Sequence, residues 1–166
     1  TEDRKQEGLI LEDTLVRNLS LPTVHKHRKA GIIDDNFLTK MSEKYIQKLK
    51  VKTTGGLQKA KNLSGGNQQK IVLGKWLSTN PKILILDEPT RGIDVGAKAE
   101  IYKLINELTA QGMAIVLISS ELPEVMGMSD RLLIMYEGRV TGQLLKEEYT
   151  EERVMEYATG RKVHNE

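Results

Sequence analysis

The feature that most constrains the fold is a strand–helix–strand pattern between residues 83 and 118. Residues 83–86 form a continuous apolar run, Ile-Leu-Ile-Leu, and residues 114–118 form a second one. Between them, apolar side chains recur at helical spacing, at Ile101, Leu104, Ile105 and Leu108. Strands that are apolar throughout are typical of a sheet buried on both faces. We therefore predict an α/β fold with a mostly parallel sheet covered by helices.

The residues ahead of this pattern are expected to be helical. Asp34 can cap a helix with apolar positions at Leu38, Met41, Tyr45 and Leu49. A second helix is predicted from Gly66 to Ser78, with Ile71, Val72 and Trp76 on its apolar side. Because no strand pattern separates the two helices, we expect an α-helical subdomain inserted ahead of the sheet. Residues 23–33, which are basic and poorly patterned, are interpreted as an exposed connection.

The last third of the chain contains a hairpin signal. Residues 131–136 and 139–143 flank the pair Glu137-Gly138, which suits a tight turn. Residues 150–158 can form a further helix.

Composition excludes several kinds of protein. The net charge is +2, which gives no electrostatic reason to propose nucleic acid as a partner. There is no cysteine, so disulfides and thiolate metal sites are excluded. The longest apolar run, residues 113–118, is far shorter than the roughly 20 residues that cross a bilayer. Because the sequence begins at Thr1 without a methionine, we expect a piece of a longer protein.

The first motif that carries chemistry is the run Leu-Ser-Gly-Gly-Asn-Gln-Gln-Lys at residues 63–70, which opens the second predicted helix. Free backbone N–H groups and the helix dipole make a helix start an anion site. Gly65 and Gly66 let the backbone approach an oxyanion, while Ser64 adds a hydroxyl and Asn67 an amide. The alternative is a simple Ser64 cap followed by a glycine turn.

The second motif is the pair Asp87-Glu88, which follows the apolar run at residues 83–86. Ligands bind at strand ends in α/β folds. Asp87 is placed to hold Mg²⁺ directly or through water, and Glu88 to polarise a water that attacks a phosphoryl group. The alternative is a surface turn with solvated acids.

The order and spacing of these two motifs resemble the ABC ATPases, and the resemblance covers essentially all 166 residues. In that family the first motif is the signature, usually written LSGGQ, and the second is the Walker B strand with its catalytic glutamate. Residues 92–94 then resemble the D-loop, with Asp94 as its aspartate. The resemblance implies a partial P-loop NTPase fold, with ATP and Mg²⁺ as cofactors of the full protein.

Within the family, the chain resembles the second cassette of bacterial double-cassette importers of ribose, galactose, xylose and related sugars, with nucleoside importers as close relatives. The resemblance rests on residues 2–9, the Asn-Gln-Gln of the signature, residues 91–98 and residues 119–124. It implies four parts. Residues 1–22 are the Q-loop region and the entry to the helical subdomain, and residues 23–80 are that subdomain with the signature. Residues 81–145 are the α/β core with Walker B, the D-loop and the switch region, and residues 146–166 are a C-terminal helix and tail.

The sequence departs from the family pattern at three places. No Gly-x-x-x-x-Gly-Lys-[Ser/Thr] occurs, so the chain lacks the Walker A loop that cradles phosphates. Glu2 takes the position of the Q-loop glutamine, and Ser120 that of the switch histidine. We therefore expect the isolated chain neither to bind ATP tightly nor to hydrolyse it.

The resemblance also implies partners and a location. Ser64, Gly65, Gly66, Asn67 and Gln68 would bind, in trans, the ATP held by the first cassette of the same polypeptide. Transmembrane permease subunits would dock beside the helical subdomain, and a sugar-binding protein would act through them. The protein would lie peripherally on the cytoplasmic face of the bacterial inner membrane.

Two further interpretations stay open at this point. One is a soluble ABC ATPase of DNA repair or translation, which the near-neutral charge disfavours. The other is a non-catalytic cassette that donates its signature without turning over. The sequence names neither the sugar nor the oligomeric state.

Overall fold

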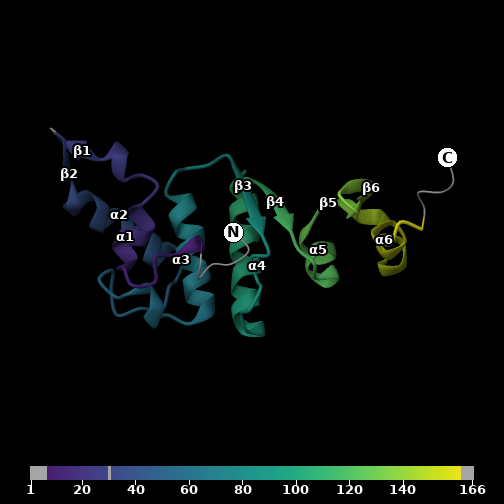
Figure 1. Ribbon diagram of the computed structural model, residues 1–166, viewed down its shortest axis with the longest axis horizontal. Helices are drawn as coiled ribbons and strands as arrows, with labels where there is room; N and C mark the ends of the chain where they lie inside the picture. The colour runs from purple at the N-terminus through teal and green to yellow at the C-terminus, as the bar shows by residue number, and fades with distance from the viewer. Residues whose placement is uncertain (1–6, 30, 162–166) are drawn as a thin grey trace. The chain divides into compact units, whose positions relative to one another are not determined.

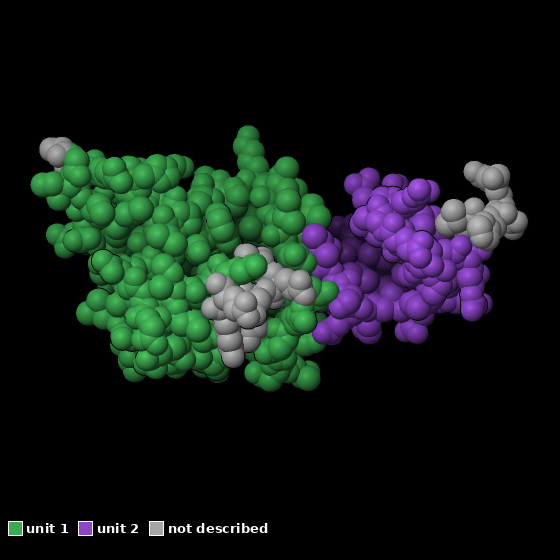
Figure 2. All heavy atoms as spheres, viewed as in Figure 1, with its two compact units in different colours: residues 1–116 green, residues 117–166 purple. Residues whose placement is uncertain are grey.

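The computed structural model describes residues 7–29 and 31–161, so Glu2 lies outside the described residues. The chain divides into two compact units, residues 1–116 and 117–166, which are coloured separately in Figure 2. In chain order, the longer elements are α1 (Leu15–Ser20), α2 (Asp35–Lys48), α3 (Gly65–Leu77), β3 (Ile83–Asp87), α4 (Val95–Ala110), β4 (Ala114–Ile118), α5 (Leu122–Met128), β5 (Arg131–Tyr136), β6 (Arg139–Leu145) and α6 (Glu151–Ala158), as Figure 1 shows.

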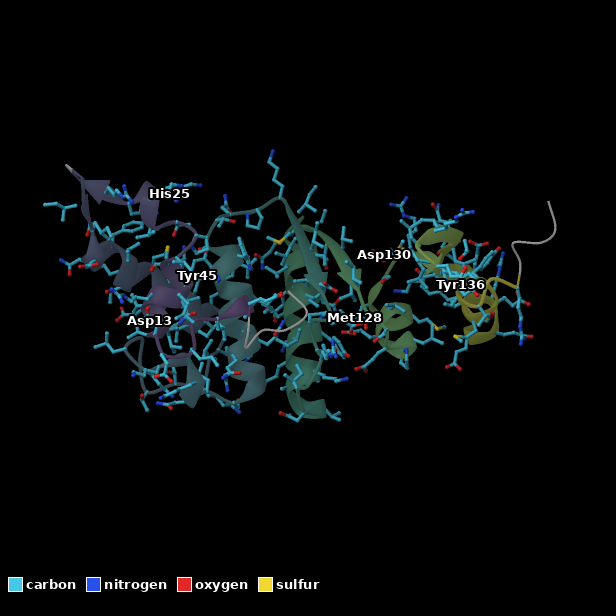
Figure 3. The ribbon with its side chains drawn as sticks, in the orientation of Figure 1. Asp13, His25, Tyr45, Met128, Asp130 and Tyr136 are labelled. Carbon is cyan, nitrogen blue, oxygen red and sulfur yellow. The ribbon has the colours of Figure 1, made fainter. Side chains whose placement is uncertain are left out.

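Three helices at the front of the first unit pack on one another. Asp34 caps α2 as predicted, because its carboxylate accepts the Phe37 N–H at 3.0 Å. The helices pack tightly at Gly74 of α3, where an added Cβ would lie 2.7 Å from Leu19 of α1 and 2.8 Å from Leu49 at the end of α2. Tyr45, labelled in Figure 3, donates its hydroxyl to the Leu77 carbonyl at 2.9 Å and so ties α2 to α3.

Two features of this region differ from the predictions. Helix α1 was not predicted, and residues 23–33 are not a plain connection: the short strands β1 (Arg28–Lys29) and β2 (Ile32–Ile33) pair antiparallel there. Two-residue strands are too short to leave an alternating pattern in the sequence. Trp76 is 46% exposed, so its place on the buried side of α3 was predicted wrongly.

The strand–helix–strand pattern forms as predicted, since β3 and β4 are neighbours in one sheet and α4 joins them. The four apolar residues of α4 that set its period are all buried: Ile101, Leu104, Ile105 and Leu108. The strands, however, were wrongly expected to be buried on both faces. Leu84 and Leu86 are buried, whereas Ile83 and Ile85, which point to the other face of the strand, are 61% and 66% exposed.

The second unit is built on the predicted hairpin. β5 and β6 pair antiparallel from Tyr136↔Arg139 to Arg131↔Leu145, with an irregularity between Ile134 and Met135. Glu137 and Gly138 both have positive φ, 47° and 76°, the backbone of a type I′ turn. Helix α6, capped by the Thr150 hydroxyl, covers one side of the hairpin with Val154, which packs with Leu132, Ile134 and Leu144. Among the described helices, none is long and apolar enough to cross a membrane.

Candidate functional site

The start of α3 presents polar groups to solvent. Ser64 occupies the N-cap position and is exposed, and Gly65 and Asn67 are half-buried. Within the described residues, the Ser64 side chain accepts no hydrogen bond from a backbone N–H of the first turn of its own helix. Its Oγ instead accepts from Nδ2 of Asn67 at 2.9 Å. Ser64 is therefore not a simple helix cap, because a simple cap uses its oxygen to satisfy the N–H groups of the first turn.

Asn67 also holds the loop at Lys52, which the sequence analysis did not associate with the motif at residues 63–70. Its Oδ1 accepts the backbone N–H of Lys52 at 2.8 Å, across 15 positions of sequence. This bond holds the segment that follows α2 against the start of α3. No pattern in the sequence indicates it, because the donor is a backbone group and any residue at position 52 except proline would supply it.

A hollow of about 260 Å³ lies between the starts of α3 and α4, which pack side by side (Figure 1). Gly66 makes this closeness possible, because a Cβ at that position would lie 2.5 Å from the Cβ of Ala97. The hollow is lined by Lys52, Ser64, Gly66, Asn67, Asp94, Gly96, Ala97 and Glu100. The structure therefore brings Asp94 together with three of the predicted signature residues.

Both carboxylates of the hollow have partners. Asp94 caps α4 by accepting the Ala97 N–H at 2.9 Å. Glu100 pairs with Lys70 at 2.7 Å, and the hydrogen bond from Lys70 holds the pKa of the Glu100 carboxyl below its usual value. Lys70 is buried and also donates to the Lys50 carbonyl at 3.1 Å. The groups of the hollow that can meet an anion are the exposed Lys52 side chain, which also lies near Glu100, and the Ser64 hydroxyl.

Gln68 does not join the other signature residues in the hollow. Its side chain is buried, and its Nε2 donates to the Ala60 carbonyl at 3.1 Å. The Oε1 atom has no hydrogen-bond partner among the described residues. Gln68 therefore faces the interior, as expected for a helix position one residue beyond those that face the hollow.

Asp87 and Glu88 lie at the end of β3, as the sequence predicts, and both are half-buried. Glu88 has a φ of 44°, in the left-handed region that costs a non-glycine residue about 1 kcal/mol. The next two residues, Pro89 and Thr90, are fully buried and anchor the turn. Among the described residues, no group of three His, Asp or Glu side chains could hold a metal. Asp87 fits Mg²⁺ only as a single carboxylate ligand, a role compatible with an ion that takes its other ligands from water and phosphates.

Ser120 belongs to the second unit and is the second residue after the end of β4. The neighbouring Ser119 donates its hydroxyl to the buried Glu124 carboxylate and accepts the Glu121 N–H at 3.1 Å. The residues missed by sequence reasoning are Lys52, Lys70 and Glu100. Lys70 stands inside the signature run, but its partner on α4 could not be read from spacing along the chain.

Comparisons with known sequences relate the chain to a family. A family model described as ABC transporter matches residues 3–91. The chain is 57% identical, over 98% of its length, to the xylose import ATP-binding protein XylG of Geobacillus kaustophilus. It is 50% identical, over 96% of its length, to the ribose import ATP-binding protein RbsA of Bacillus subtilis. The chain spans 32% of the length of each relative.

Solved structures with the same fold support the predicted α/β class. The ADP conformation of MJ1267, an ATP-binding cassette of an ABC transporter, matches with a TM-score of 0.71 and 26% identity, over 91% of this chain and 64% of that chain. The dimeric post-hydrolysis state of the cassette MJ0796, bound to ADP and Pi, matches with a TM-score of 0.72 and 24% identity, over 86% of this chain and 60% of that chain. The predicted fold class is therefore confirmed.

Proposed function

The chain belongs to the ABC transporter family, and from this we propose that it is the signature-bearing part of the ATP-binding subunit of a bacterial sugar importer. Support comes from the sequence identity of 50% or more with proteins named for xylose and ribose import. Because the two relatives differ in the sugar they are named for, we propose a monosaccharide importer without choosing between these sugars. Nucleoside import is the alternative within the same type of protein.

The observation that carries the proposal is the exposed Ser64 hydroxyl at the rim of a hollow whose acids are already engaged. In our proposal, the segment made of Ser64, Gly65, Gly66 and Asn67 binds the terminal phosphate of ATP that is held by the first cassette of the same polypeptide. This contact exists only when the cassettes close, so ATP favours closure by differential binding. The helical subdomain moves with closure and passes the motion to the transmembrane permease subunits.

Asp87 and Glu88 have separate proposed roles at the end of β3. Asp87 holds Mg²⁺, which neutralises phosphate charge when it is bound. Glu88 accepts a proton from the attacking water, a role that its position at a strand end allows. Asp94 communicates between the cassettes from the cap of α4. Ser120, shorter than histidine and never cationic, makes a weaker contact at the switch position, and Glu2 occupies the Q-loop position.

The remaining proposals concern the whole protein. We place it on the cytoplasmic face of the inner membrane, with a sugar-binding protein acting through the permease, and we assign this chain to the second cassette. The four-part division at residues 22, 80 and 145 also stays a proposal. Because no phosphate-loop pattern occurs in the 166 residues, the isolated chain should not bind ATP tightly. Micromolar binding in a nucleotide titration with Mg²⁺ would contradict this.

The test of the proposed function is Ser64→Arg in the intact transporter, reconstituted in lipid vesicles. The long cation fills the hollow, so ATP-driven sugar uptake should be lost while the protein folds and assembles normally. Asn62→Arg is the matched control, because Asn62 is exposed, lies two positions away and does not line the hollow. Normal uptake by the Ser64→Arg transporter would overturn the assignment.

A second experiment separates a catalytic cassette from one that only donates its signature. Glu88→Gln in the intact protein removes the proposed base and keeps the size of the side chain. Loss of ATP turnover supports the catalytic role, whereas unchanged turnover favours the non-catalytic module.

A further inference from the structure

The orientation of the Asn67 amide is fixed by its neighbour. The backbone N–H of Lys52 can only donate, so the Asn67 atom that faces it at 2.8 Å is the acceptor Oδ1. The other end of the same amide, Nδ2, can only donate, and it faces the Ser64 Oγ at 2.9 Å. Ser64 Oγ is therefore the acceptor of that bond.

This direction leaves the hydrogen of the Ser64 hydroxyl for another partner. A hydroxyl has one hydrogen and two lone pairs. One lone pair of Ser64 is occupied by Asn67, and the exposed side chain turns toward the hollow at the start of α3. Within the described residues, the oxygen is also not used to cap the helix. The hydrogen is therefore available to a ligand oxygen in the hollow.

We propose that Asn67 is a positioning residue that sets the Ser64 hydroxyl as an outward donor, so that the site accepts an oxygen without a proton, such as an ionised phosphoryl oxygen. This inference rests on the proposed function. The bonds run in one direction, from Lys52 N–H to Asn67 and from Asn67 to Ser64, and each bond polarises the next. The conformation of the segment at Lys52 is thereby coupled to the donor that meets the ligand.

A purely structural role for Asn67, as a tie between the Lys52 segment and α3, predicts a different response to Asn67→Asp. A carboxylate introduced there can still accept the Lys52 N–H, so the tie is kept. It cannot donate to Ser64, and the Ser64 hydroxyl then donates to the carboxylate and is turned away from the ligand. Asn67→Asp thus reverses the direction of the hydrogen bond between residue 67 and Ser64 without releasing the Lys52 segment from α3.

The test is a double-mutant cycle of Asn67→Asp and Ser64→Ala in the intact transporter, with kcat/KM for ATP as the readout. With Ser64 present, Asn67→Asp should lower kcat/KM by about tenfold, the loss expected for one hydrogen bond to a charged group. In the Ser64→Ala background it should lower kcat/KM by clearly less, because only the repulsion between the new carboxylate and the phosphate remains and no hydroxyl is left to be turned. An equal loss in both backgrounds would identify a charge effect and overturn the inference.

Hydrogen–deuterium exchange of the peptide around Lys52 completes the test in the same intact protein. Exchange should stay at the wild-type rate in Asn67→Asp and rise in Asn67→Ala, which removes the acceptor. Faster exchange in Asn67→Asp would also overturn the inference, because the segment would have been released. If Ser64→Ala alone leaves kcat/KM unchanged, the proposed function itself fails, a result distinct from an additive cycle in which Ser64→Ala is impaired.

Discussion

Gly66 of α3 and Ala97 of α4 meet so closely that a Cβ on Gly66 would lie 2.5 Å from the Cβ of Ala97. Real Cβ contacts of this length essentially do not occur. Because a Cβ is fixed to its backbone, relieving the contact would require the backbone of α3 or α4 to shift. The spacing of the two helix starts, and with it the width of the hollow between them, is thus set by the missing side chain of one residue.

Gly66→Ala should therefore destabilise the chain by about 1–3 kcal/mol, the usual cost of overpacking, despite the better helix propensity of alanine. Ala97→Gly relieves the contact, so the double variant should be more stable than Gly66→Ala alone. Urea unfolding of the two single variants and the double variant measures this coupling. Strictly additive effects would show that the two positions do not press on each other.

The Lys70–Glu100 pair should contribute about 1 kcal/mol to the free energy of unfolding, because water screens the half-exposed Glu100 although Lys70 is buried. Glu100→Gln removes the charge that balances Lys70. The hydrogen bond from Lys70 lowers the pKa of Glu100 below 4.5, so this stabilisation is present above that pH and is lost as the pH falls through the folded-state pKa. Urea unfolding at neutral and acidic pH should show the difference shrinking. Glu107→Gln, at an exposed site on the same helix, is the control and should be neutral.

Lys75 should make stability depend on alkaline pH. It is buried and donates to the Gly8 carbonyl at 3.2 Å, and burial lowers its pKa from the usual 10.5. Between the folded-state pKa and 10.5 the unfolded chain binds more protons, so the free energy of unfolding should rise with pH. Burial raises the pKa of Tyr45 above its usual 10.0, so ionisation of Tyr45 makes the free energy of unfolding fall with pH, but only from near pH 10 upward. Denaturant curves across the alkaline range below pH 10.5 should lose the rising slope in Lys75→Met, and an unchanged slope would refute the assignment.

Asn18 should be among the most sensitive polar positions of the first unit. It is fully buried, its Oδ1 accepts the Ile10 N–H at 2.8 Å, and its Nδ2 donates to the carbonyls of Ile10 and Thr14 at 3.0 Å. Asn18→Leu strands these backbone groups, so we expect a loss of about 2–4 kcal/mol. Thermal unfolding measures it, and the exposed Asn36→Leu should change the melting temperature little.

The sequence predicted best those elements whose pattern is local. The period of α4, the Asp34 cap of α2 and the Glu137-Gly138 turn all depend on residues within a few positions of one another. Burial was predicted less well, because Ile83 and Ile85 have the composition of a two-sided core strand, although their exposure depends on what packs against the sheet.

The candidate site was likewise predictable only where its residues are close together in the sequence. The polar residues at the start of α3 could be found from their own run of sequence, and the hollow contains Ser64, Gly66 and Asn67 as predicted neighbours. The groups that contact the signature residues lie outside that run of sequence. Lys52, whose N–H binds Asn67, lies in the loop before α3, and Glu100, which pairs with Lys70, lies on α4. Their contacts arise from packing, which periodicity along one segment cannot reveal.

Helix α3 is 13 residues long, or about 20 Å from end to end. At Gly74, near its C-terminal end, the helix packs closely against α1 and the end of α2, and Ser64 occupies the N-cap position at its N-terminal end. Because Gly66 packs against Ala97 at the Ser64 end as well, the helix is held at both ends. A displacement at Gly74 is therefore transmitted along a stiff rod to the serine, where a shift of less than about 1 Å changes the length of a hydrogen bond.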